Sequence, residues 1–215
     1  MKKLTLIVLS LFLVSFIFFA SMAFAKTAPK AKNKLLSGKK PQKISKTIQK
    51  AQQPKELVTY FSATGHTSDV AKALAKILNA PIVEIVPAQP YSGADLDWRA
   101  KHSRASKEHA DPTARPAIRE ANLALGQFDT IYLGFPIWWG DVPRIILTYI
   151  ETHDLAGKKI ILFATSGGSD FGDIASNLQK RLPKSKVIEG KVFPGFIADN
   201  DIENQINDWL KTLKK

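Results

Sequence analysis

Strand-like and helix-like segments alternate along residues 56–215, and this alternation restricts the chain to few folds. The strand-like segments are short runs of β-branched and aromatic residues, whereas the helix-like segments carry apolar residues every three or four positions. Five strands are predicted, at residues 57–61, 81–86, 130–135, 159–164 and about 186–193. Apolar strands that alternate with helices predict an α/β fold, a parallel sheet covered on both faces. Ligands bind at the carboxyl ends of the strands in such sheets.

Helices are predicted after most of these strands. Apolar residues at i, i+4, i+7 and i+8 mark the first one, and they are Val70, Leu74, Ile77 and Leu78. Two more are expected to begin at Pro143 and at about Phe171, and the last runs over residues 202–213. Proline suits the first helical position because an N–H group there would have no partner.

A basic and then apolar segment opens the sequence. Met1-Lys2-Lys3 precedes an apolar stretch, and Ala23-Phe24-Ala25 forms an A-x-A cleavage site before Lys26. This order is typical of a secretory signal peptide over residues 1–25. Residues 4–25 are also long enough to span a bilayer, so an uncleaved membrane anchor is the alternative. We therefore expect an exported protein, periplasmic or otherwise extracytoplasmic.

Residues 26–55 differ in composition from the rest of the chain. They contain ten lysines, no acidic residue and few large apolar side chains, which predicts a disordered linker without a core. With Lys2 and Lys3, these lysines account for the whole formal charge of +12. Residues 56–215 hold all 19 acidic residues and 19 basic ones, so the predicted domain is neutral.

Charge and cysteine content limit the partners and the chemistry. The lysine-rich linker suits contact with an anionic membrane or an acidic wall polymer, and a solvated spacer is the alternative. A neutral domain argues against nucleic acid as a partner. The sequence has no cysteine, which excludes disulfides, Fe–S clusters and thiol nucleophiles.

Residues 62–67 link the first strand to the first helix and carry hydroxyls on Ser62, Thr64 and Thr67. The start of a helix leaves amide N–H groups unpaired and carries partial positive charge. Gly65 lets the backbone approach a ligand closely. A phosphate fits such a turn. The alternative is an ordinary turn in which Thr67 or Ser68 caps the helix.

Two common phosphate loops are excluded at this turn. A P-loop needs Lys-Ser/Thr after its last glycine, but His66-Thr67 follows Gly65. The dinucleotide fingerprint needs three glycines at fixed spacing, and this turn has one. The turn therefore predicts a hydroxyl-lined site for a single phosphate, with no lysine and no metal-binding carboxylate.

A second loop, residues 136–141, follows the third strand and contains adjacent tryptophans. Successive residues in an extended loop point in opposite directions. One of Trp138 and Trp139 is thus expected to lie inward and the other over a flat ligand. The alternative is that both pack in the core.

A third loop, residues 165–170, follows the fourth strand. Its glycines, Gly167 and Gly168, let backbone N–H groups reach the oxygens or nitrogens of a ring. Ser166 is no nucleophile elbow, because Ala164 stands where that motif requires glycine. A phosphate turn, an aromatic wall and glycine-rich amides at adjacent strand ends predict a site for a flat phosphorylated ring, and FMN is the obvious candidate.

The motifs resemble those of the flavodoxin family over roughly residues 56–213. Residues 62–67 resemble its S/T-x-T-G-x-T phosphate loop, and residues 134–140 and 165–169 are similar to the two isoalloxazine loops of a bacterial branch. A long segment over residues 91–116 is similar to one in the same branch. The resemblance implies a flavodoxin-like three-layer sandwich with five parallel strands in the order 2-1-3-4-5 and non-covalently bound FMN.

The resemblance also implies which residues bind the cofactor. Those around the phosphate are Ser62, Ala63, Thr64, Gly65, His66 and Thr67. Those that flank the ring, with Trp138 or Trp139 stacked on it, are Pro136, Ile137, Trp138, Trp139 and Gly140. Those at the ring edge are Ser166, Gly167, Gly168 and Ser169.

Of the departures from the family pattern, which include His66 where Asn is often found and a predicted export signal, two concern charge and the ring site. Electron-shuttling flavodoxins are strongly acidic, and their charge steers them to partners, whereas this predicted domain is neutral. The second aromatic wall of the ring is often a Tyr after the fourth strand, and here only Phe171 is near.

Residues 87–120 leave three interpretations open. His102 and His109 are seven positions apart, which would suggest a metal site if both lay on one helix face. A lid that binds an anionic group through Arg99, Arg104 or Arg115 is a second interpretation. A plain surface excursion is the third.

We thus expect residues 56–215 to form an exported FMN-binding domain that transfers electrons, with no catalytic side chain and no bound metal. Its partner would be a redox protein or a small-molecule acceptor. One alternative is an NAD(P)H-dependent FMN reductase of quinones or similar acceptors. The other is a non-catalytic interaction module of the envelope.

Overall fold

The computed structural model describes residues 55–119, 124–196 and 199–213. The predicted signal peptide, residues 1–25, lies outside the described residues, and so does the predicted linker except for its last residue, Lys55. Lys55 pairs with Asp129 at 3.3 Å beside the first strand. Within the described ranges, no helix is both long and apolar enough to cross a membrane.

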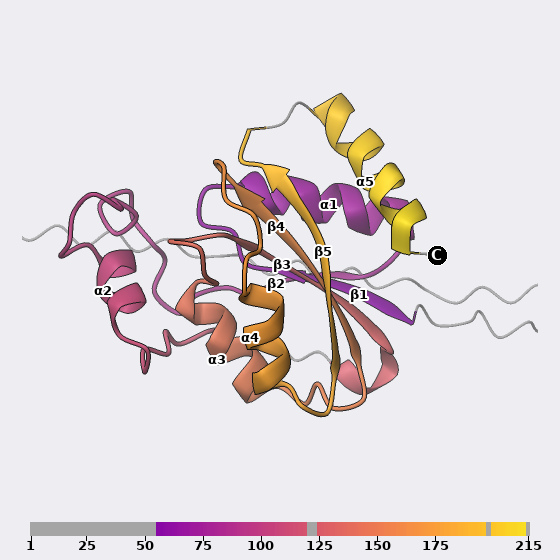
Figure 1. Cartoon of the computed structure of the whole chain (residues 1–215), viewed down its shortest axis with the longest axis horizontal. Coiled ribbons are helices and arrows are strands. Elements are labelled where there is room, and N and C mark those ends of the chain that lie inside the picture. Colours follow the sequence, from indigo (N-terminus) through magenta and orange to yellow (C-terminus); the bar gives the residue numbers. More distant parts are fainter. Residues whose placement is uncertain (1–54, 120–123, 197–198, 214–215) are drawn as a thin grey trace, which may run out of the picture. The chain divides into compact units, whose positions relative to one another are not determined.

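Five parallel strands form one sheet in the order β2-β1-β3-β4-β5 (Figure 1). The strands are β1 (Glu56–Tyr60), β2 (Ile82–Glu84), β3 (Thr130–Pro136), β4 (Lys159–Ser166) and β5 (Lys186–Pro194). The helices are α1 (His66–Leu78), α2 (Arg104–Ala110), η1 (Leu125–Gln127), α3 (Arg144–Thr152), α4 (Ile174–Arg181) and α5 (Asp199–Leu213). The predicted fold class and strand order are confirmed.

Two helices cover each face of the sheet. On one face, α1 and α5 pack their apolar stripes against Val58, Tyr132 and Phe163. On the other face, α3 and α4 pack against side chains such as Leu57 and Leu133. Neighbouring strand residues thus serve opposite cores, as the two-residue period of a strand requires. Figure 1 shows the two pairs of helices on opposite sides of the strands.

The glycine at position 134 of β3 allows this close packing. A Cβ on Gly134 would overlap the ring of Phe163, which is fully buried on the neighbouring strand β4. The Phe163 ring therefore lies directly over the β3 backbone.

Several predicted boundaries shift by one to three residues in the structure; α3, for example, begins at Arg144, one residue after Pro143, and α5 begins at Asp199. The second strand covers three residues, Ile82–Glu84, instead of 81–86. The helix expected at about Phe171 begins at Ile174. Phe171 instead packs in the loop before it, against Phe135 with ring centroids 6.4 Å apart. Its burial pulls that loop into the core, so the helix starts later.

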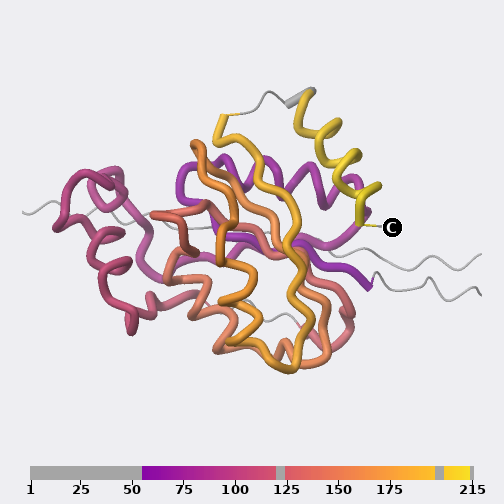
Figure 2. The backbone as a smooth tube through the Cα atoms, in the orientation of Figure 1, coloured from indigo at the N-terminus to yellow at the C-terminus, as the bar shows by residue number. Residues whose placement is uncertain are grey.

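A long excursion, residues 87–119, leaves the sheet after β2 and returns before η1 (Figure 2). Two backbone bonds close its base, from Ala88 N–H to the Ala117 carbonyl and from Arg119 N–H to the Val86 carbonyl, both 2.8 Å. The excursion carries α2, a helix that the sequence pattern left open. We call residues 87–119 the excursion below.

Candidate functional site

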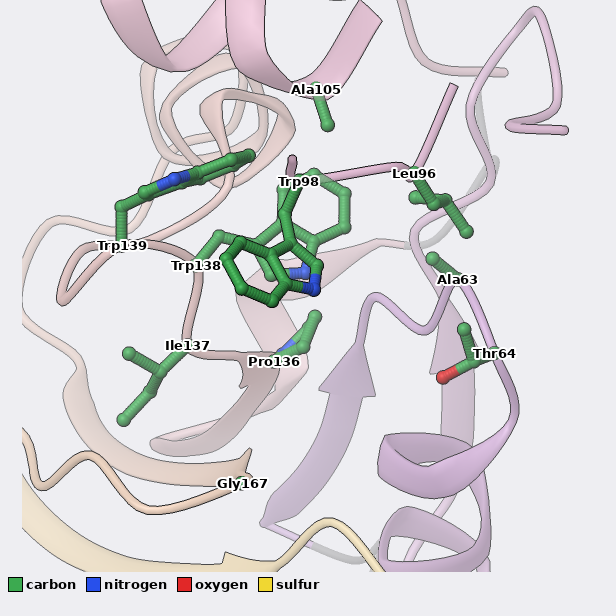
Figure 3. A pocket seen from close by; sticks show the side chains of 10 residues that line it. All are labelled: Ala63, Thr64, Leu96, Trp98, Ala105, Pro136, Ile137, Trp138, Trp139 and Gly167. Atoms are coloured by element: carbon green, nitrogen blue, oxygen red, sulfur yellow. The ribbon is translucent and has the colours of Figure 1, made fainter. Parts of the chain in front are cut away.

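Three loops meet at the carboxyl ends of β1, β3 and β4, which are neighbours in the sheet. There they border a pocket of about 390 Å³ (Figure 3). The predicted site residues that line it are Ala63, Thr64, Pro136, Ile137, Trp138, Trp139 and Gly167. Three residues of the excursion, Leu96, Trp98 and Ala105, complete the lining. The structure thus brings residues from all three predicted loops to one concave site.

The turn at residues 62–67 is built around Gly65. Its φ of 98° lies in the region that favours glycine, and its N–H group donates to Ser62 Oγ at 3.1 Å. Gly65 is the N-cap residue of α1, and no side chain caps that helix. The alternative in which Thr67 or Ser68 caps the helix is therefore wrong. The uncapped first turn keeps its amides available to an outside acceptor.

Two hydroxyls near this turn have protein partners. Thr67 is buried, and its Oγ1 lies 2.7 Å from Thr165 Oγ1 at the end of β4. This bond ties the first loop to the third. Ser68 Oγ donates to the Tyr60 hydroxyl at 3.1 Å. Thr64 is exposed at the edge of the pocket, so it is the predicted phosphate-loop hydroxyl that a ligand reaches most directly.

His66 lies at the outer side of the turn. Its ring contacts Phe196, in the connection after β5, with ring centroids 4.6 Å apart. Phe196 itself is 88% exposed. The first loop therefore meets both the end of β4 and the connection that follows β5.

The two tryptophans after β3 both line the pocket, but their surroundings differ. Trp138 and Asp141 exchange two backbone bonds of 3.0 Å, which leaves Trp139 and Gly140 at the tip of a tight turn. Both tip residues have positive φ, 49° and 73°, a combination that such two-residue turns require. Trp138 packs edge-on against Phe61 at 5.7 Å, whereas Trp139 is 41% exposed.

Trp139 stacks against the imidazole of His109 in α2. Their ring centroids are 4.9 Å apart and the planes are inclined by 17°, which is a stacked arrangement. A non-glycine residue with positive φ is strained, and this contact helps to hold the indole where it is. The predicted stacking of Trp138 or Trp139 on a ligand stays a prediction.

The loop after β4 is closed by Ser166. Its Oγ accepts from the N–H groups of Gly168 at 3.1 Å and Ser169 at 2.7 Å. These two amides, expected to face a ring, are directed to Ser166 instead. Gly167 is exposed and lines the pocket, so its backbone is the part of this loop nearest to a ligand.

Arg144 of α3 joins the second loop to the excursion. Its guanidinium contacts Asp141 Oδ2 at 3.0 Å, the His109 carbonyl at 2.8 Å and the Glu108 carbonyl at 3.2 Å. The Arg144 side chain is only 12% exposed. One cation thereby fixes the end of α2 against the loop that carries Trp139.

A second polar network stiffens the excursion itself. Tyr91 donates to Glu108 Oε2 at 2.5 Å, and Arg104 Nε contacts Glu108 Oε1 at 2.6 Å. The Arg104 guanidinium also lies 4.0 Å from the centre of the Tyr91 ring. Burial, together with the bond to Glu108, raises the pKa of Tyr91 well above its usual range. Tyr91 therefore stays a neutral donor, and its ring packs edge-on against Trp138 at 5.6 Å.

Two of the three cations proposed for a lid are paired with carboxylates, and the third lies against Trp98. Arg104 pairs with Glu108, and Arg115 pairs with Glu151 of α3 at 2.6 Å. The Arg99 guanidinium lies 4.3 Å from the centre of the Trp98 ring.

The histidines of the excursion do not share a helix. His109 lies in α2, and His102 lies in the turn before it. No group of three potential ligands is found among the residues that the structure describes. The interpretation of His102 and His109 as one helix face is therefore wrong.

Sequence reasoning missed Leu96, Trp98 and Ala105 as pocket residues. Of these three residues, Trp98 could have been recognised from the sequence, because a tryptophan within a polar stretch is unusual. Its position over the pocket depends on the path of the whole excursion, and no periodic pattern encodes that path.

The strand order, the uncapped turn after β1 and the pocket at the strand ends define a doubly wound α/β protein of flavodoxin-like topology. A family profile described as flavodoxin matches residues 55–212. The chain belongs to the flavodoxin family.

Solved structures agree with this assignment. A proposed flavoprotein from Bacteroides uniformis ATCC 8492 is 43% identical, with a TM-score of 0.66, and the match covers 72% of this chain and 99% of that one. A proposed flavoprotein from Bacteroides eggerthii DSM 20697 is 41% identical, with a TM-score of 0.63, over 73% of this chain and 98% of that one.

A more distant structure shares the fold. The flavoprotein from Lactobacillus acidophilus NCFM, solved in complex with FMN, is 19% identical with a TM-score of 0.57, over 73% of this chain and 99% of that one. No curated protein matches the chain.

Proposed function

We propose that the chain binds FMN non-covalently and acts in electron transfer. One observation carries this proposal: an uncapped helix start with an exposed hydroxyl borders the same pocket as two tryptophans and a glycine backbone. Two relatives above 40% identity bear proposed flavoprotein descriptions. A third protein of the same fold was solved with FMN.

The pocket fits the two parts of FMN. Amides at the start of α1 suit a phosphate dianion, because they are unpaired and carry partial positive charge. The turn adds the hydroxyls of Ser62 and Thr64. Pro136, Ile137 and the tryptophans provide the apolar surface that a fused ring needs. We assign the phosphate to residues 62–67 and the ring to the space beside residues 136–140, with Gly167 at the edge of the ring.

FMN supplies the electron chemistry when bound, and the protein supplies binding, orientation and tuning. The uncapped amides fix one end of the ligand. Trp138, held by Phe61 and Tyr91, sets the floor of the pocket. Ser166 Oγ keeps the third loop closed, so that Gly167 stays at the ring edge. No side chain is assigned as an acid or base.

Export is part of the proposal. Residues 1–25 have the pattern of a signal peptide and residues 26–55 that of a lysine-rich linker. The partner outside the cytoplasm would be a redox protein or a small acceptor. The linker suits contact with an anionic surface.

A second candidate is an NAD(P)H-dependent reductase on the same fold, for which the excursion completes a binding pocket. The excursion turns the strand-end site into a concave pocket of about 390 Å³ with apolar walls, and small molecules bind in such pockets. The third interpretation, a non-catalytic module, leaves the uncapped turn and the exposed Trp139 without a role.

The test is FMN titration of the purified protein, followed by visible absorption and quenching of FMN fluorescence. We expect a flavin spectrum and saturable quenching. Thr64→Glu places a negative charge in the phosphate turn and should abolish FMN binding. Ser176→Glu adds the same charge at an exposed position of α4 that does not line the pocket, and it should leave FMN binding unchanged. A protein that ignores FMN would refute the proposal. Oxidation of NAD(P)H by the loaded protein would select the reductase.

A further inference from the structure

The excursion supplies a wall of the pocket that no strand-end loop provides. Leu96, Trp98 and Ala105 line the pocket from this side, and Ala105 is buried behind it. Figure 3 shows the Trp98 indole reaching into the pocket from the excursion, while Pro136 and Ile137 line it from the β3 side. The pocket thus lies between Trp98 and the second loop.

The turn that carries Trp98 is preformed. Asp95 accepts from the backbone and hydroxyl of Ser92 at 2.9 and 2.7 Å. The Ala105 N–H then donates to the Asp95 carbonyl at 2.9 Å. Asp97 Oδ1 accepts from the Arg99 N–H at 3.0 Å. These bonds bracket Trp98 on both sides, so its backbone position is set without a ligand.

The whole wall is also fixed to the second loop. Arg144 holds the end of α2 beside Asp141, and the Tyr91 ring packs against Trp138. Two independent contacts therefore set the spacing between the two sides of the pocket. The excursion is therefore a fixed wall of the pocket, held by these contacts, and does not have the structure of a mobile lid.

Trp98 is exposed in spite of this order. The residue is 62% exposed, and the Arg99 guanidinium lies 4.3 Å from the centre of its ring. A large aromatic side chain that is exposed on a fixed turn and borders a concave apolar pocket indicates a contact with a ligand. The shape of an indole suits the face of a flat ring.

The aromatic residue expected to provide the second wall cannot do so. Phe171 is 3% exposed and packs against Phe135 in the core. It does not line the pocket. Trp98 lines the pocket and has the free surface that Phe171 lacks.

We infer that Trp98 is the outer wall of the flavin ring site, so that the bound ring lies between Trp98 and the loop of residues 136–140. This inference rests on the proposed function and adds a binding residue to it. Trp98 acts by direct contact with the cofactor, and the Ser92–Asp95 and Asp97–Arg99 bonds position it.

A covered ring face also separates the two candidate functions. Hydride transfer requires a nicotinamide stacked on the ring, so Trp98 would have to turn away first. Transfer of single electrons at an exposed ring edge requires no such movement. Trp98 as a wall therefore favours the electron carrier over the reductase.

The experiment compares wild type, Trp98→Ala, Trp98→Phe and the control Lys101→Ala by FMN titration. Lys101 is exposed on the same segment and does not line the pocket. Trp98→Ala should bind FMN about tenfold more weakly, because it loses a stacked aromatic contact. It should also quench FMN fluorescence less at saturation. Trp98→Phe should recover most of the affinity, and Lys101→Ala should match wild type.

Footprinting of the wild-type protein makes the test independent of any variant. Hydroxyl radicals should oxidise Trp98 less when FMN is bound, relative to Ile82, which is exposed on the edge strand β2 and does not line the pocket. Wild-type affinity in Trp98→Ala, or equal oxidation of Trp98 with and without FMN, would overturn the inference while the proposed function stands. Failure of the wild type to bind FMN would overturn both.

Discussion

The strand-end loops and the excursion form opposite walls of one pocket, but different forces hold them. The loops follow β1, β3 and β4, and the backbone ladders of the sheet fix where each one starts. The excursion leaves the sheet for residues 87–119. Backbone bonds close its base, but its far end is held to the second loop by side chains, above all Arg144. The strand-end loops should therefore lose their positions only when the whole fold unfolds, whereas single substitutions should be enough to loosen the excursion.

The largest effect is expected where the sheet itself is broken. Gly134→Val places a side chain into the ring of Phe163, which is fully buried and cannot move aside. We expect the free energy of unfolding to fall by about 3 kcal/mol from overpacking. Urea unfolding measures this fall in stability. FMN binding should be lost as well, because the positions of all three loops depend on the sheet.

The matched control is Gly126→Val, because a Cβ there meets open space. Its unfolding midpoint should stay close to that of the wild type. Equal stability of the two variants would show that the sheet does not need glycine at position 134.

A smaller and local effect is expected at the excursion. Arg144→Met keeps the apolar stem but removes the contacts with Asp141 and with two carbonyls of α2. The loss should be about 2 kcal/mol, since these are charge-assisted bonds of a poorly exposed group. Hydrogen exchange should speed up in residues 91–110 and remain slow in β3 and β4.

Arg181→Met is the control for charge removal, because Arg181 is exposed and lies 3.5 Å from Glu151. Its effect should be about 0.5 kcal/mol or less. Uniform acceleration of exchange across the sheet in Arg144→Met would contradict the idea that the two walls are held separately.

The same contrast explains what the sequence could predict. Leu57, Val58 and their counterparts on the other strands alternate between two cores, and this period is visible without any tertiary information. The strand-to-helix turn at Gly65 was predicted too, because one glycine among hydroxyls fits such a turn, but whether a side chain caps the helix was left open. The strand order came from the family resemblance.

The structure of the excursion could not be predicted from the sequence, and the reason is physical. Its shape depends on contacts between residues far apart in sequence, such as Arg144 with the carbonyls of α2 and Arg115 with Glu151. Such long-range pairs leave no periodic pattern in the sequence. Phe171 shows the related difficulty, because its apolar character did not tell a helix start from a buried loop.

A third prediction concerns the ring of Tyr91, which links the two walls. Tyr91→Phe keeps the packing on Trp138 but loses the bond to Glu108. The expected loss is about 1 kcal/mol, the usual value for one hydrogen bond. Thermal unfolding measures it, and FMN affinity should change little because the ring stays in place. Tyr91→Ala, which also removes the ring, should lower both quantities.

The smallest predicted effect is a pH dependence confined to the excursion. The bond from Arg115 holds the pKa of Glu151 below its usual value of 4.5, and bonds from Thr113 likewise lower the pKa of Asp111. Carboxyls with lowered pKa values stabilise the fold above their ordinary pKa, and that contribution is lost as the pH falls through the lowered value. Relative to the intrinsic exchange rate at each pH, the protection of residues 111–119 should therefore fall below about pH 4.5.

Arg115→Gln tests the cause of this acid response. The variant lacks the cation that lowers the pKa of Glu151, so exchange in residues 111–119 should already be faster at neutral pH and should change less on acidification. Thr130 and Ile131 in β3 should show no change in either protein over the same range, because backbone ladders hold them. If β3 lost protection from exchange on acidification together with the excursion, the two walls would form one cooperative unit, and the idea that they are held separately would be wrong.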